Sequence, residues 1–279
     1  MTTKTRIEVR PMTGALGAEI FGVDIARMDD ATFDEIYAAW LEHLVVFFRD
    51  QDITPEQQLA FAHRFGEIHT HPYMKGLDDY PEILEIVKEP KDTYTFGNVW
   101  HTDQMFTPKP AKATILYAKE TPSAGGDTMF ANMYMAYETL SEGMRNMLDG
   151  MVGISSSAKA RVTQTRRDRM KTSAKVSGAM ELEAEHPVVR THPETGRKAL
   201  YVNYGHTVRF KDMTEAESTP LLNFLYAHQS RPEFTCCFRW QPGSIAFWDN
   251  RCTQHNPVND YHGFKRTMHR ITIAGDRPT

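Results

Sequence analysis

A chain of 279 residues, 41% of them hydrophobic, is long enough for one large domain or two small ones and can bury a substantial core. A formal net charge of −4 gives it no general attraction to nucleic acid or to anionic membranes, and no apolar run approaches the ~20 residues that span a bilayer. Two of the three cysteines are adjacent, so they do not suggest a disulfide framework, and we expect a cytoplasmic protein.

The first third of the chain predicts two helices, each next to a strand. One helix begins at Asp29 or Asp30, either of which can cap it, and its apolar residues recur at helical spacing as far as Leu44. The other begins at Thr54, because Pro55 fits a first turn and Gln57 completes a capping box. The strands expected here are 7–10 and 45–48.

The rest of the chain reads mainly as strands. One helix is expected over 135–149, interrupted at Ser141, which can cap a second segment. Residues 234–240 and 244–248 are expected to form the two strands of a hairpin, joined by a turn at Pro242-Gly243. The other expected strands are 113–119, 128–131 and 271–274. Many short strands, with helices mostly early, favour a mainly β domain over 1–279, a double-sheet jelly roll with added helices.

A basic segment interrupts this pattern. Residues 159–175 carry seven lysines and arginines against a single acidic residue, Asp168. A solvated helix or mobile loop is the simplest interpretation, and a basic lid over an anionic substrate is the alternative. A nucleic-acid patch is less consistent with a negative chain whose basic run lacks interleaved aromatic residues. We therefore treat the region around 155–185 as a candidate lid or insert.

Three residues form a candidate metal centre. His101 and Asp103 lie two residues apart, so their side chains would share one face of a strand, and His255 would arrive from a distant strand. Two imidazoles and one carboxylate leave three adjacent coordination positions open, which is typical of non-haem Fe(II) oxygenases. A His-x-Asp tripeptide is weak evidence alone; the later Arg266 and Arg270, which could each hold an anion, strengthen it.

Other chemistries remain open at this point. The same three ligands with an activated water would suit a zinc hydrolase, in which the arginine pair has no obvious place. A non-catalytic binder of an anionic metabolite is a further alternative. His69 and His71 could also ligate zinc, but no third ligand lies nearby in sequence, so we expect His69 to be structural and His71 to be a polar group of a pocket.

Beyond single motifs, the chain from Pro11 to Pro278 resembles the Fe(II)- and 2-oxoglutarate-dependent dioxygenases of the taurine dioxygenase and aryloxyalkanoate dioxygenase group. The combination of motifs is far more specific than any one of them. The matching segments are Gly17-Ala18-Glu19-Ile20, Phe48-Arg49-Asp50-Gln51, Trp100-His101-Thr102-Asp103, Gly125-Gly126-Asp127-Thr128, His186-Pro187-Val188-Val189-Arg190-Thr191-His192-Pro193 and Trp248-Asp249-Asn250.

This resemblance implies a role for each matching residue. It makes His101, Asp103 and His255 the iron ligands. It assigns Thr128 and Arg266 to the distal carboxylate of 2-oxoglutarate, Arg270 to the anionic end of the primary substrate, and His71 to a sulfonate. It also implies a double-stranded β-helix, Fe(II), 2-oxoglutarate and O2 as cofactor and cosubstrates, and often a homodimer or homotetramer.

The substrate pocket departs from the taurine enzymes. Their tyrosine three residues after the pocket histidine is Met74 here, with Tyr73 adjacent, and their asparagine four residues before the first iron ligand is Gly97, with Asn98 beside it. An aromatic wall residue of theirs corresponds to His206. The resemblance therefore implies hydroxylation of a small anion with release of succinate and CO2. A taurine-like sulfonate is expected first, and an aryloxyalkanoate or another carboxylate is the alternative.

Overall fold

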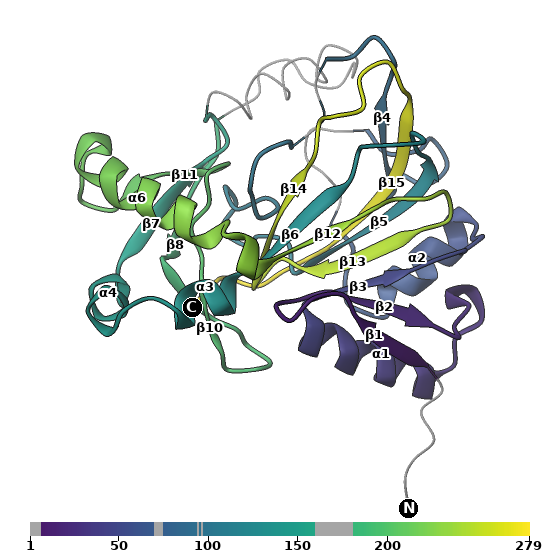
Figure 1. The fold of residues 1–279 in the computed structure, drawn as a ribbon, viewed down its shortest axis with the longest axis horizontal. Helices are drawn as coiled ribbons and strands as arrows, with labels where there is room; N and C mark the ends of the chain where they lie inside the picture. Colours follow the sequence, from purple (N-terminus) through teal and green to yellow (C-terminus); the bar gives the residue numbers. More distant parts are fainter. Residues whose placement is uncertain (1–6, 70–74, 94, 96, 160–180) are drawn as a thin grey trace, which may run out of the picture.

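The computed structural model describes residues 7–69, 75–93, 95, 97–159 and 181–279, and their fold is mainly β with helices at the periphery (Figure 1). The strands are β1 (Glu8–Pro11), β2 (Ala18–Phe21), β3 (Val45–Phe48), β4 (Leu84–Lys88), β5 (Ala113–Glu120), β6 (Thr128–Asn132), β7 (Val152–Ser156), β8 (Glu183–Pro187), β9 (Val189–Thr191), β10 (Lys198–Leu200), β11 (Thr207–Phe210), β12 (Thr235–Phe238), β13 (Ile245–Asp249), β14 (Thr253–Pro257) and β15 (Arg266–Ile273). The helices are α1 (Asp30–His43), α2 (Pro55–His63), α3 (Met133–Glu138), α4 (Glu142–Leu148) and α6 (Glu215–Gln229), with short 3-10 turns at Ile25–Arg27 and Pro232–Phe234.

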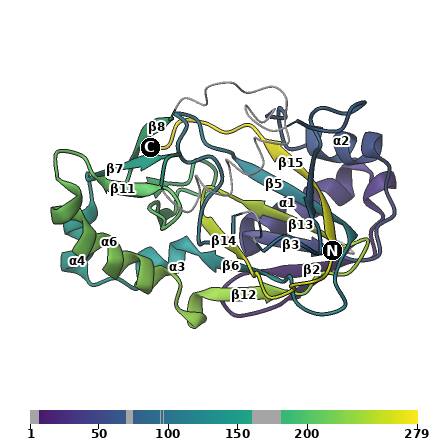
Figure 2. The ribbon, with the colours of Figure 1, turned by 90° about the horizontal axis from the view of Figure 1, so that it is seen from above.

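The largest sheet has the strand order β1-β2-β3-β13-β5-β15-β4, and only its β2–β3 pair is parallel. Helices α1 and α2 cover one face of this sheet (Figures 1 and 2), where Trp40 stacks on Phe247 with ring centroids 4.7 Å apart. Both helices have the predicted caps: the Asp29 side chain accepts from the Thr32 N–H, and Thr54 and Gln57 form the expected capping box.

A second sheet of order β12-β6-β14 packs on the opposite face of the large sheet. Phe47 of β3 stacks on Phe238 of β12 at 4.0 Å between ring centroids, and Phe130 of β6 lies 5.5 Å from Trp248 of β13. Aromatic side chains thus fill the space between the two sheets. Smaller sheets, β11-β7-β8 and β10-β9, extend the fold beside them, and Figure 1 labels β7, β8, β10 and β11 there.

The predicted hairpin over 234–248 is wrong. Strand β12 pairs with β6, whereas β13 lies between β3 and β5 in the other sheet. The connecting turn carries Gly243 with a φ of +81°, and its N–H donates to the Ala118 carbonyl while its carbonyl accepts from the Gln51 N–H. A turn flanked by two apolar runs looks the same in sequence whether the second run returns to its neighbour or crosses to another sheet.

Two further boundaries differ from expectation. The helix predicted over 135–149 is indeed two helices with Ser141 capping the second, but α3 begins at Met133 because the Asn132 side chain accepts from the Tyr134 and Met135 N–H groups. The last strand begins at Arg266 rather than 271. The second difference matters for function, since it places Arg266 and Arg270 inside a strand.

Two predictions fall wholly or partly outside the described residues. They concern His71 and most of the candidate lid, of which residues 160–180 are not described. Within the described part of the chain, no helix is both long enough and apolar enough to cross a membrane.

Candidate active site

The two histidines of the predicted metal centre are brought together by backbone pairing. His101 and His255 form an isolated antiparallel bridge, in which each N–H donates to the other's carbonyl at 3.1 and 2.9 Å. The expectation of a continuous strand through Asp103 is wrong, because the chain turns after His101. There the Thr102 hydroxyl donates to the Thr253 carbonyl, and the Asp103 N–H donates to the Asn250 side chain instead of a strand partner.

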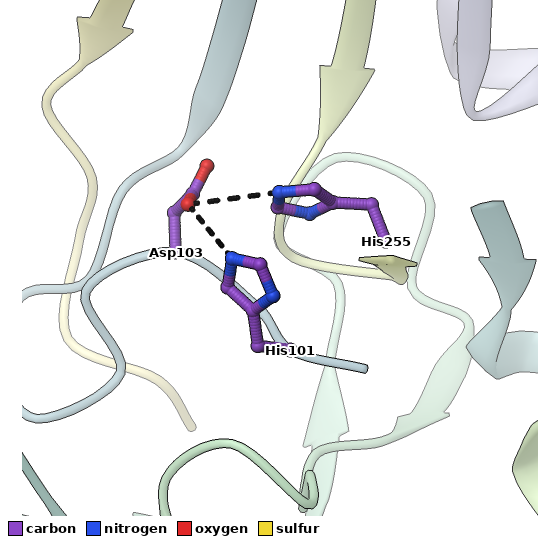
Figure 3. A group of neighbouring side chains, drawn as sticks. All are labelled: His101, Asp103 and His255. Carbon is purple, nitrogen blue, oxygen red and sulfur yellow. Dashed lines mark ion pairs between the residues drawn. The ribbon is translucent and has the colours of Figure 1, made fainter. Parts of the chain in front are cut away.

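All three side chains converge on one point (Figure 3). The Nε2 atoms of His101 and His255 lie 3.7 and 3.9 Å from Oδ1 of Asp103. One potential ligand atom from each residue lies within 4.8 Å of the others, and all three residues are buried. The spacing and the donor set therefore suit a single metal ion, with Oδ1 and two Nε2 atoms as ligands.

The hydrogen bonding of His101 fixes which nitrogen is free. Its Nδ1 lies 2.7 Å from the Val99 carbonyl, and a carbonyl can only accept, so Nδ1 carries the proton. The lone pair of Nε2 then faces Asp103. This is the usual arrangement of a metal-bound histidine, whose other nitrogen is held by a backbone carbonyl or a carboxylate.

The charges of the cluster also suit metal binding. Burial lowers the pKa of His101 and of His255, so both imidazoles are neutral at pH 7 and keep a lone pair for a metal. Burial alone would raise the pKa of Asp103, but the groups around the carboxylate outweigh burial, the Arg270 guanidinium most strongly, and hold that pKa below its usual range. The carboxylate is therefore ionised.

Neighbouring side chains orient the carboxylate. The Thr114 hydroxyl donates to Oδ2 of Asp103 at 2.7 Å and accepts from Nδ2 of Asn250 at 3.0 Å. Oδ1 of Asn250 in turn accepts from the Asp103 N–H and from Nε1 of Trp248. Because Oδ2 is engaged in this way, Oδ1 is the oxygen that faces the histidines.

A pocket opens from the metal cluster and contains three more of the predicted residues, Thr128, Arg266 and Arg270. The Thr128 hydroxyl accepts from Nε1 of Trp240 at 2.9 Å, which leaves its proton for another acceptor. Arg266 is buried with Nε and Nη2 unpartnered among the described residues. Burial lowers the pKa of Arg266. Burying a guanidinium without a partner costs free energy, so this pocket suits an anion that pairs with Arg266.

Arg270 lies close to the metal cluster itself. Its Nη2 is 2.8 Å from Oδ1 of Asp103, while its buried Nε has no partner among the described residues. Arg266 and Arg270 are four residues apart on β15, so both side chains lie on the same face of the strand. The predicted anion-holding residues are thus placed in one pocket with the predicted metal ligands.

The candidate substrate residues are placed less directly. The buried His206 ring lies 6.0 Å from the His101 ring and 5.2 Å from that of Phe106, and burial lowers the pKa of His206 to about 3. Asn98 is half-buried in the turn before His101. Neither is among the residues that line the pocket. His71 lies outside the described residues.

Several residues of the site were not predicted from sequence. Lys88 and Tyr261 line the pocket, and Thr114 and Asn250 orient Asp103. The available signal for Lys88 was alternation: in Leu84-Glu85-Ile86-Val87-Lys88 the lysine shares a face with Leu84 and Ile86. Thr114 gave no signal, because a threonine within a strand is ordinary.

A mainly β fold enclosing two histidines and a carboxylate is the arrangement of a non-haem iron oxygenase. Comparison with known proteins agrees: the model of the taurine catabolism dioxygenase TauD, TfdA family matches residues 8–272. An alkylsulfatase of Acinetobacter baylyi is 37% identical, over 98% of this chain and 87% of that protein. An alpha-ketoglutarate-dependent sulfate ester dioxygenase of Pseudomonas putida is also 37% identical, over 98% of this chain and 91% of that protein.

A solved taurine dioxygenase from Burkholderia xenovorans has the same fold, with a TM-score of 0.83 and 37% identity over 98% of this chain and 93% of that one. The chain therefore belongs to the taurine catabolism dioxygenase TauD, TfdA family. It is a 2-oxoglutarate-dependent non-haem iron dioxygenase that uses Fe(II), 2-oxoglutarate and O2, as the sequence predicted.

Proposed function

We propose that this enzyme oxidises the carbon that bears the sulfate oxygen of a small, amine-free alkyl sulfate ester, or the sulfur of the corresponding sulfonate. The observation that carries the proposal is one pocket that contains the histidine–carboxylate cluster and two buried arginines with unpartnered nitrogens. One arginine suits the cosubstrate and the other suits an anionic substrate.

His101, Asp103 and His255 are the proposed iron ligands. The facing Nε2 and Oδ1 atoms and the protonated Nδ1 of His101 support this role. Fe(II) held there supplies, together with 2-oxoglutarate, the activation of O2. What the protein supplies is a fixed ligand set, because the Thr114 hydroxyl holds the second carboxylate oxygen of Asp103.

Thr128 and Arg266 are the proposed partners of the distal carboxylate of 2-oxoglutarate. The Thr128 hydroxyl already accepts from Trp240, so its own proton is directed to a further acceptor. Arg266 offers two unpartnered donors to a carboxylate. Together they would orient the dicarboxylate along the pocket toward the histidines.

Arg270 is the proposed partner of the substrate's anionic group, next to the reacting carbon. In a sulfate ester R–CH2–O–SO3⁻, one oxygen of O2 inserts into the C–H bond to give R–CH(OH)–O–SO3⁻. This product breaks its C–O bond to give the aldehyde, sulfate and a proton. The other oxygen of O2 enters 2-oxoglutarate, which leaves as succinate and CO2.

The relatives' names and the substrate pocket support a substrate without an amine. Two relatives at 37% identity are named for sulfate esters. Gly97 has no side chain to meet an amine, and a Cβ there would lie 2.9 Å from the His101 ring. Asn98, His206 and His71 are proposed to shape the substrate's surroundings, the first two from beside the first iron ligand.

The two packed sheets are proposed to form the double-stranded β-helix expected for the family, in a single domain. Face-to-face packing of β3 and β13 against β6 and β12 supports this architecture. A homodimer or homotetramer in the cytoplasm, and a lid around 155–185, remain parts of the same proposal.

Succinate formation with Fe(II), 2-oxoglutarate and O2 tests the function. Hexyl sulfate, hexanesulfonate, taurine and phenoxyacetate are compared at equal concentration, with aldehyde and sulfate or sulfite measured in parallel. We expect strong stimulation by the first two compounds. Stimulation by phenoxyacetate alone would replace the sulfo substrate with a carboxylate, and stimulation by taurine above both would overturn the amine-free assignment.

A further inference from the structure

The pocket holds a third cation that the proposed function does not use. Lys88 is the last residue of β4, is only 3% exposed, and lines the same pocket as Thr128 and Arg266. Its Nζ lies 3.4 Å from the Tyr261 carbonyl and 4.5 Å from the centre of the Tyr261 ring. Lysine is almost never fully buried unless its charge is paired, so the burial of Lys88 needs an explanation.

The strand register puts this lysine directly opposite Arg266. In the antiparallel β4–β15 pair, Lys88 faces Arg266, Ile86 faces Met268 and Leu84 faces Arg270. Directly opposed residues share one face of the sheet, with Cβ atoms about 5 Å apart, and like charges there repel. Here both charges are also buried, which strengthens the repulsion because little water screens it.

No ion pair among the described residues neutralises these two cations. Among the described residues, no carboxylate forms an ion pair with Lys88 or with Arg266. Tyr261 and, more weakly, Asp127 favour the charged form of Arg266, but neither forms an ion pair with it. Arg266 keeps two unpartnered nitrogens. A buried pair of like charges without a counter-ion is destabilising by itself, and an anion between the two side chains would remove the penalty.

We propose that Lys88 is a second cationic contact for the distal carboxylate of 2-oxoglutarate, beside Arg266. This inference rests on the proposed function, which assigns that carboxylate to Thr128 and Arg266. The Tyr261 ring lies near both cations, 4.5 Å from Nζ of Lys88 and 6.0 Å from the guanidinium carbon of Arg266. Succinate keeps the same carboxylate, so Lys88 also slows the release of this product.

The test is the Lys88→Met variant, which keeps an unbranched four-atom stem and removes the charged ammonium group. Binding of 2-oxoglutarate and of succinate to the Fe(II)-loaded protein is measured by calorimetry under nitrogen, so that no turnover occurs. We expect both dissociation constants to rise about tenfold, as on the loss of one hydrogen bond to a charged group. 2-Oxovalerate, which lacks the distal carboxylate, should bind the variant and the wild type equally.

Controls separate a binding role from a structural one. Lys119→Met removes an exposed lysine that also lies over a tyrosine ring, at 5.0 Å from Tyr117, and should leave all three affinities unchanged. Lys88→Arg keeps the positive charge, so its dissociation constant for 2-oxoglutarate should lie within about threefold of the wild-type value. Without ligand, Lys88→Met should melt no lower than the wild type, because it removes a repulsion.

Unchanged 2-oxoglutarate affinity in Lys88→Met, or equal weakening for 2-oxovalerate, would overturn the inference while leaving the proposed function intact. Should Lys88→Met fail to fold, Lys88→Gln compared with Lys88→Arg gives the same contrast in charge. If the wild type does not bind 2-oxoglutarate at all, the proposed function fails, and the inference with it.

Discussion

At the scale of single residues, the clearest prediction concerns the three proposed iron ligands. His255 offers Nε2 to the proposed iron site and is held there by its backbone bridge to His101. His255→Ala removes one of three ligands but keeps the bridge, so the protein should fold and lose iron-dependent succinate formation. Near-normal turnover in this variant would contradict the ligand assignment, and circular dichroism with a melting curve checks that the fold is kept.

Thr114, whose hydroxyl donates to the Asp103 carboxylate, should also affect iron binding strongly. Thr114→Val keeps the shape of a buried strand residue and removes the hydroxyl that donates to Oδ2 of Asp103. Asp103 then gains freedom to turn, and Asn250 loses an acceptor. We expect iron affinity to fall by roughly 10- to 100-fold, measured by competition with a chelator. Thr272→Val, at another buried threonine on the adjacent strand, is the matched control and should leave iron affinity unchanged.

Sequence reasoning at this scale worked where a residue's chemistry is unusual. His101, Asp103, His255, Arg266 and Arg270 stand out as motif residues, and the structure places all five around one pocket or cluster. Residues whose role depends only on their place in the fold could not be predicted from the sequence. Thr114 and Lys88 become meaningful only when strand register shows what lies opposite or beside them.

At the scale of secondary-structure elements, the local sequence pattern predicted where helices begin better than it predicted which strands pair. The caps of α1, α2 and α4 are local hydrogen bonds, so the sequence contains all of their determinants. Strand pairing depends on residues far away, and for this reason the hairpin over 234–248 was wrong and β4 was not predicted.

The turn between β12 and β13 can be tested directly. Gly243 has a φ of +81°, and a Cβ there would lie 3.1 Å from the Gln51 carbonyl. Gly243→Ala should lower the free energy of unfolding by about 1–2 kcal/mol, measured by urea denaturation, because an L-residue strains that conformation. Gly143→Ala, inside helix α4 with open space around it, should instead stabilise by up to about 1 kcal/mol. Equal effects at both glycines would refute the role of the turn.

At the scale of the whole molecule, a buried ion network joins distant parts of the chain. Asp249 at the end of β13 accepts from Nε2 of His192, 3.0 Å away, and from two guanidinium nitrogens of Arg251. Arg251 also pairs with Glu194, which accepts from the Tyr37 hydroxyl of α1. Glu194 and Thr195 donate their N–H groups to Nδ1 of His192, so Nε2 carries the proton and the cluster is structural rather than a second metal site.

This network makes stability depend on pH. Burial alone would raise the pKa of Asp249, but Arg251 and His192 outweigh it and hold that pKa below 3.8, its value in the unfolded chain. A depressed carboxyl pKa contributes stability that is fully present above the unfolded pKa and is lost as the pH falls through the folded pKa. The free energy of unfolding of the wild type should therefore fall from about pH 5 downward.

Asp249→Asn removes the charge and keeps the shape, leaving Arg251 buried with only Glu194 to balance it. At pH 7 the variant should lose about 3 kcal/mol of unfolding free energy, because one member of a buried ion pair is gone. Below about pH 4 the difference between variant and wild type should narrow, because the unfolded wild-type chain then takes up a proton at Asp249 that the folded protein, with its lower pKa, does not. Urea denaturation at pH 7, 4 and 3 measures both effects, and a difference that stays constant with pH would mean that the charge of Asp249 does not stabilise the fold.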